Sequence, residues 1–168
     1  PNAANSTQAL VYSTFFGGSD QDVAYDMARD SSGKYYLCGF TISRDFPVLN
    51  ALYPVSALGG TDGWVSVIDP SQPPSAALVY SSYVTSPGFQ IASAVDVDSN
   101  GVIYLVGTSF GNVFAPGPLT PPPNSNTNAF FLVFQLDPLP GPASVTSTTL
   151  RRAPRTSGTR VASRPSTR

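Results

Sequence analysis

Short stretches in which apolar and polar residues alternate recur along the chain, and each ends at a group of glycine, proline, aspartate or serine residues. This alternation is typical of β-strands, because successive side chains of a strand point to opposite faces of a sheet. The pattern predicts strands over the ranges 9–16, 23–29, 34–41, 64–68, 91–98 and 130–136. Glu is absent and Lys occurs once, so the scarcity of helix-favouring residues also indicates an all-β fold.

The predicted strands form a unit that the chain contains twice. Residues 10–39 and 78–107, which lie 68 positions apart, share eleven identities in thirty positions, where unrelated segments would share about two. We therefore divide the chain into a first copy, residues 10–77, and a second copy, residues 78–145. A fixed period of this length indicates supersecondary units that pack on one another in tandem.

The same turn joins two predicted strands in each copy. Asp30-Ser31-Ser32-Gly33 in the first copy corresponds to Asp98-Ser99-Asn100-Gly101 in the second. An aspartate in first place and a glycine in last place suit a type I turn followed by a left-handed residue. Both segments therefore predict β-hairpins.

Four strands in each copy predict the blades of a β-propeller. The strand over 91–98 is expected to lie innermost, because strict alternation gives it one face of small and acidic residues: Ala92, Ala94, Asp96 and Asp98. Small side chains suit a strand near a crowded axis. A two-layer sandwich of about eight strands is the alternative, although a sandwich does not require the repeat.

Several motifs of the first copy resemble one family of repeats. They are Leu-Val-Tyr-Ser-Thr-Phe-Phe-Gly-Gly-Ser at residues 10–19, the turn at residues 30–33, Asp45-Phe46-Pro47, and Gly-Gly-Thr-Asp-Gly-Trp-Val at residues 59–65. This wording resembles the bacterial SBBP family of β-propeller repeats over roughly residues 8–140, with some decay in the second copy. The resemblance implies a propeller within a large exported or cell-surface bacterial protein. We accordingly expect an extracellular, non-catalytic scaffold that binds a protein or glycan ligand.

Within this scheme the two copies do not complete a propeller. Residues 9–16 are expected to be the outer strand of a preceding blade, residues 19–86 one complete blade, and residues 87–150 a second blade. Its outer strand is predicted at Val145–Leu150. Because propellers have about 4–8 blades, we expect further blades from the same chain or from another chain.

The charges divide the chain of 168 residues into two parts. Residues 1–150 carry ten Asp and three cations, a net charge of −7, whereas residues 151–168 carry six Arg. This last segment contains no aromatic residue and is predicted to be a disordered tail. Nucleic-acid binding is therefore not expected. The apolar runs are also too short to predict a membrane-spanning helix.

Two acidic motifs are the candidates for metal binding or catalysis. Asp96 and Asp98 begin a sequence that starts like a calcium-binding EF-hand loop, but the twelfth position is Gly107 where that loop needs an acid. The second motif contains Asp20, Asp22 and Asp30. We expect these side chains to hold turns and to bind no cofactor; the alternative is a calcium-dependent or hydrolytic propeller that uses these aspartates. The chain has no His, so the usual base for a nucleophile is missing.

Aromatic residues of the predicted loops are the remaining candidates for binding. They are Tyr35, Phe46, Tyr53, Phe89 and Phe110. Propeller loops carry binding sites, so these side chains are predicted to line a surface for a sugar or a peptide. The alternative interpretation places most aromatic side chains in the core between blades.

Overall fold

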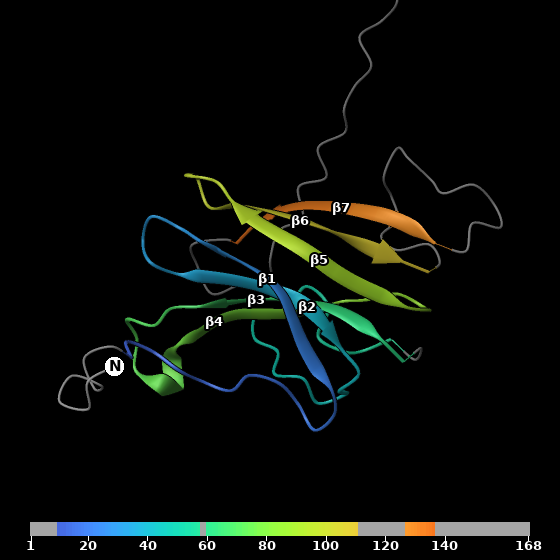
Figure 1. The fold of residues 1–168 in the computed structure, drawn as a ribbon, viewed down its shortest axis with the longest axis horizontal. Helices are drawn as coiled ribbons and strands as arrows, with labels where there is room; N and C mark the ends of the chain where they lie inside the picture. The colour runs from blue at the N-terminus through green and yellow to red at the C-terminus, as the bar shows by residue number, and fades with distance from the viewer. Residues whose placement is uncertain (1–9, 58–59, 111–126, 137–168) are drawn as a thin grey trace, which may run out of the picture.

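The computed structural model describes residues 10–57, 60–110 and 127–136, and these residues form an all-β structure of two antiparallel sheets. The first sheet contains β1 (Asp22–Arg29), β2 (Tyr35–Thr41), β3 (Asp62–Ile68) and β4 (Leu78–Val84). The second contains β5 (Gln90–Val97), β6 (Val102–Ser109) and β7 (Asn128–Gln135). Both follow chain order, and a short 3-10 helix, η2 (Pro74–Ala76), precedes β4. Figure 1 shows the two sheets stacked in layers.

The hairpins form where the sequence predicts them. Asp30 and Gly33 close the turn between β1 and β2 with a backbone hydrogen bond of 3.2 Å, and Asp98 and Gly101 close the turn between β5 and β6 with one of 3.0 Å. Gly33 has a φ of 95° and Gly101 a φ of 78°, a region that L side chains rarely adopt. The glycine that ends each turn is therefore required by its backbone.

A β-bulge corrects the predicted faces of the strand over 91–98, and the corresponding strand of the first copy contains an equivalent bulge. The register of β5 against β6 shifts between Ala92 and Ala94, and β1 shifts against β2 between Ala24 and Asp26. A bulge inserts one unpaired residue and so exchanges the two faces of the strand beyond it. Ala92 consequently shares the buried face with Val95, and the predicted continuous face of small and acidic residues does not form.

The predicted strand over 9–16 is also wrong for the residues that the structure describes. Residues 10–16 have no regular secondary structure, although β4 has nearly the same sequence. β4 pairs with β3, whereas no described strand pairs with residues 10–16. Strand formation here depends on a neighbour. The predicted strand Val145–Leu150 and the predicted tail 151–168 lie outside the described residues.

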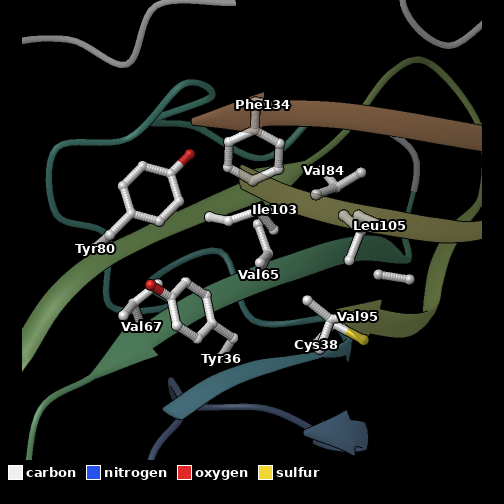
Figure 2. Close-up of a cluster of buried hydrophobic side chains, with 11 residues drawn as sticks. Tyr36, Cys38, Val65, Val67, Tyr80, Val84, Val95, Ile103, Leu105 and Phe134 are labelled. Atoms are coloured by element: carbon white, nitrogen blue, oxygen red, sulfur yellow. The ribbon is translucent and has the colours of Figure 1, made fainter. Parts of the chain in front are cut away.

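The core lies between the two sheets (Figure 2). The first sheet contributes Tyr36, Cys38, Val65, Val67, Tyr80 and Val84. The second sheet contributes Ala92, Val95, Ile103, Leu105 and Phe134. β5 contacts every strand of the first sheet. The two sheets are thus joined by one shared apolar layer, and burial of that layer is the main source of cohesion between them.

A smaller aromatic cluster covers the opposite face of the first sheet. Phe46, Trp64 and Tyr83 are buried there, and Phe16 and Tyr53 pack against them. The rings of Phe46 and Trp64 lie 5.2 Å apart between centroids. The Tyr83 hydroxyl donates to the Ser43 carbonyl at 2.9 Å and accepts from the Phe46 N–H at 3.1 Å. These contacts hold the loop after β2 against the sheet.

Candidate functional site

The hairpin aspartates make the same contacts in both copies. The Asp30 carboxylate accepts hydrogen bonds from the Ser32 hydroxyl at 2.8 Å, the Lys34 N–H at 2.9 Å and the Tyr36 hydroxyl at 3.2 Å. Desolvation acts to raise its pKa, but these donors together outweigh desolvation and lower the pKa. The carboxylate of Asp30 therefore holds the turn.

Asp98 accepts from the N–H groups of Asn100 at 2.8 Å and Val102 at 2.9 Å, and from the Tyr104 hydroxyl at 3.3 Å. The bond from Val102 is the main reason that the pKa of Asp98 is lowered. A cation would need these carboxylate oxygens to be free, but the three donors already occupy them. The EF-hand-like opening therefore forms an Asx turn, as the sequence predicts.

A second polar position recurs at the start of β1 and of β5. Asp22 accepts from the Gly18 N–H at 2.7 Å, from Thr41 at 2.5 Å and from Ser43 at 3.1 Å. Gln90, its counterpart 68 residues later, accepts from the Ser86 N–H at 3.2 Å. Since the amide accepts a backbone N–H as the carboxylate does, this position closes the loop before β1 and the loop before β5 without needing an acid.

Asp26 joins the two sheets. Its carboxylate accepts the backbone N–H of Val95 at 3.0 Å, so the residue after the bulge of β1 holds the edge of β5. The sequence offered no signal for this contact, because its partner is 69 residues away and the second copy has Ala94 in place of Asp26.

The remaining acidic candidates lie apart. Asp20 and Asp96 are exposed, and the Asp96 carboxylate accepts the N–H of Val97 at 2.8 Å. Asp22 and Asp30 lie at opposite ends of β1, about 26 Å apart for eight residues of strand, whereas glycosidase carboxylates lie within about 10 Å. In the described part of the chain no three His, Cys, Asp or Glu residues come together as a metal site would require.

A buried carboxylate supports the loops near the start of β3. Asp62 is 2 % exposed and accepts the hydroxyls of Ser56, at 2.5 Å, and Thr85. The Thr85 hydroxyl in turn accepts the N–H of Ala57 at 3.0 Å. These bonds fix the loop that follows β2 to the end of β4.

A shallow pocket of about 310 Å³ lies beside these loops and is lined by Ile42, Arg44, Ser56, Ala57, Gly60 and Thr61. Arg44 and Ile42 are exposed at its rim. The lining offers a guanidinium, two hydroxyls and two apolar side chains, and none of the six is an acid, an imidazole or a thiol. Such a surface can bind hydroxyl or carboxylate groups, but it supplies no general base.

The predicted aromatic surface separates into three places. Phe46 is 3 % exposed and belongs to the aromatic cluster, so its assignment to a binding surface is wrong; its ring packs on Trp64 and Tyr83. Tyr53 is half-buried against the same cluster. Phe89 and Phe110 form an edge-to-face pair with centroids 5.6 Å apart, and Phe110 is exposed. Tyr35 lies near the hairpin, under the Arg29 guanidinium at 5.8 Å.

The single thiol is enclosed in the core. Cys38 is fully buried, and burial, with a smaller contribution from Asp26, raises its pKa to about 12. A thiol in this position stays protonated at neutral pH, so it is unsuited to nucleophilic attack or metal binding.

The comparisons leave the family open. A scan against protein-family models finds no match for the chain, and a search of curated proteins finds none. The likeness to SBBP repeats therefore stays a prediction. Within the described residues there is also no helix of sufficient length and apolarity to cross a bilayer.

Proposed function

We propose that the chain is a non-catalytic β-propeller repeat module of an exported or cell-surface bacterial protein, and that it binds a protein or glycan ligand through its loops. The repeated turn carries this proposal. Asp30 and Asp98, at equivalent places, are both engaged by backbone N–H groups and a tyrosine hydroxyl. Side chains that perform the same structural task in tandem copies are typical of repeat scaffolds.

The pocket beside Arg44 is the proposed binding site. Its loops are held by the buried carboxylate of Asp62, so the pocket does not have to be ordered on binding, which lowers the cost of association. A guanidinium next to hydroxyls and an apolar side chain favours a ligand that carries a carboxylate and hydroxyl groups, such as a uronic acid or an acidic peptide segment.

Binding to arrays of acidic and neutral oligosaccharides and of acidic peptides tests this function. Arg44→Ala should remove binding to the acidic probes. Arg29→Ala is the matched control, because it also removes an exposed arginine, and Arg29 is the last residue of β1 and does not line the pocket. Equal binding by both variants, or no binding to any probe by the unmodified chain, contradicts the proposal.

The alternative function, a calcium-dependent or hydrolytic propeller that uses the aspartates, makes a different prediction. A ligand that binds only the folded chain raises its melting temperature. We expect calcium to leave the melting temperature unchanged, because Asp22, Asp30 and Asp98 already accept hydrogen bonds from the protein. A rise that a chelator reverses would favour the alternative.

A further inference from the structure

We propose that the chain binds further copies of itself head to tail, through an exposed face of the second sheet that packs on the β1 side of the first sheet of another copy. The first of these surfaces is named here the outer face, and comprises Tyr104, Val106, Phe131 and Val133. The second is named the β1 face, and comprises Ala24, Met27, Tyr35 and Leu37. This association is independent of any ligand at Arg44.

The contact between the two sheets of one chain supplies the template. Cys38 lies opposite Val65, and Tyr36 lies opposite Val67, on the side of the first sheet that the second sheet covers. Cys38 and Val65 are 0 % and 1 % exposed. The second sheet meets them mainly with β5, whose Val95 lies beside Cys38 in Figure 2.

The repeat places four corresponding residues on the outer face. Val106 lies opposite Phe131, and Tyr104 lies opposite Val133, in the same relation as the pairs of the first sheet. Here, however, Val106 is 40 % exposed and Phe131 is 63 % exposed. The rings of Tyr104 and Phe131 stack with centroids 6.4 Å apart. Tyr104 and Val133 are half-buried. An apolar surface that is buried in one copy of the repeat is thus exposed in the other at Val106 and Phe131.

The β1 face is the other half of the same contact. In β5, Ala92 is fully buried and Val95 is 6 % exposed. Their counterparts in β1 are Ala24, which is exposed, and Met27, which is 57 % exposed. Met27 lies opposite Leu37, as Val95 lies opposite Leu105. Leu37 also packs against the aromatic cluster, so Ala24 and Met27 form the exposed part of the β1 face. Each half of the intersheet contact therefore occurs once with exposed residues in place of buried ones, and the two exposed halves are complementary.

Two complementary but different surfaces make a heterologous contact, which builds a ring if the rotation closes and a filament if it does not. One bond of the template is missing. The Asp26 carboxylate binds the Val95 N–H within the chain, but the outer face carries Ala94 in place of Asp26. The contact between copies is consequently expected to be weaker than the contact within a chain, and to depend on concentration.

The proposal is tested by light scattering and sedimentation of the full chain. Protein concentrations should reach about 1 mM, because a contact with a binding free energy of about 4 kcal/mol is half-formed there. We expect the mean mass to rise with concentration. Phe131→Asp and Met27→Asp, one on each half, should each give a monomer. Their equimolar mixture should give a 1:1 dimer and nothing larger, because only one complementary pair of surfaces remains. Val55→Asp is the control, since Val55 is 71 % exposed and belongs to neither surface.

A gain of affinity makes the test sharper. Ala94→Asp restores the missing carboxylate, so it should tighten association by about tenfold through a new hydrogen bond from the Met27 N–H of the next copy. Phe131→Asp adds the same charge to the same sheet and should instead abolish association. The fluorescence emission of Trp64, compared with that of the unmodified chain, shows whether each variant is folded. If Phe131→Asp or Met27→Asp unfolds, Phe131→Thr or Met27→Thr takes its place. A monomer at every concentration, equal loss with Val55→Asp, or no dimer in the mixture overturns the proposal.

Discussion

Replacing Asp26 by alanine should destabilise the whole protein, because this carboxylate ties the first sheet to the second. In Asp26→Ala the N–H of Val95 loses the acceptor that lies 3.0 Å away and stays at the boundary between the sheets. Hydrogen bonds to charged groups contribute about 1.5–3 kcal/mol, so we expect the free energy of unfolding to fall by about 2 kcal/mol. For a chain of this size that corresponds to a loss of roughly 4–8 °C in melting temperature.

The single tryptophan provides the assay. Trp64 is buried in the aromatic cluster of the first sheet, so its emission reports unfolding in denaturant, and an unchanged slope against denaturant would show that only stability has changed. Asp20→Ala is the matched control, because it removes the same charge from an exposed side chain and should cost less than about 0.5 kcal/mol. Asp26→Asn keeps a neutral acceptor and should fall between the two. Equal losses in Asp26→Ala and Asp20→Ala would refute the role of the bond.

Two further predictions concern ionisable groups. The pKa values of Asp30 and Asp98 are lowered in the folded chain, so their carboxylates contribute stability that is present above about pH 4 and is lost as the pH falls through the folded-state values. The melting temperature of the double variant Asp30→Asn, Asp98→Asn should therefore decline less steeply in acid than that of the unmodified chain, and an equally steep decline would contradict this prediction. The Cys38 thiol, with its pKa raised to about 12 and no exposed surface, should not react with a disulfide reagent in the folded chain and should react once per chain in denaturant; rapid reaction of the native protein would show that the core opens.

The strands and their order were largely predictable because turn residues delimit them. The expected strands 23–29 and 34–41 match β1 and β2 to within one residue at each end, since the Asp30 turn allows no other boundary. The repeat then carries the same assignment to β5 and β6. Local turn chemistry and a duplicated sequence are sufficient for these elements, because both signals are contained within a few neighbouring residues.

What the sequence could not reveal depends on contacts between distant residues. Residues 10–16 have the sequence of a strand but no described partner, and Phe46 has the sequence context of a loop but is buried against Trp64. The bulge at Ser93 places Ala92 on the same buried face as Val95, and no residue type indicates a bulge of this kind in the sequence. One signal was visible: Asp22 and Gln90 occupy equivalent positions, and a polar acceptor in both copies indicates a shared structural task rather than a lost acid.

The core between the sheets also has a consequence for synthesis of the chain. Val84 ends the first sheet and Phe134, near the end of β7, closes the layer that covers it. About fifty residues separate these positions, and at about 5–20 residues per second a ribosome needs several seconds to produce them. Throughout that interval the valines and tyrosines of the nascent first sheet lack their complete cover, because β5 is made before the other two strands of its sheet. During this interval a chaperone could bind the exposed apolar face of the first sheet, and two nascent chains on neighbouring ribosomes would be most prone to aggregate.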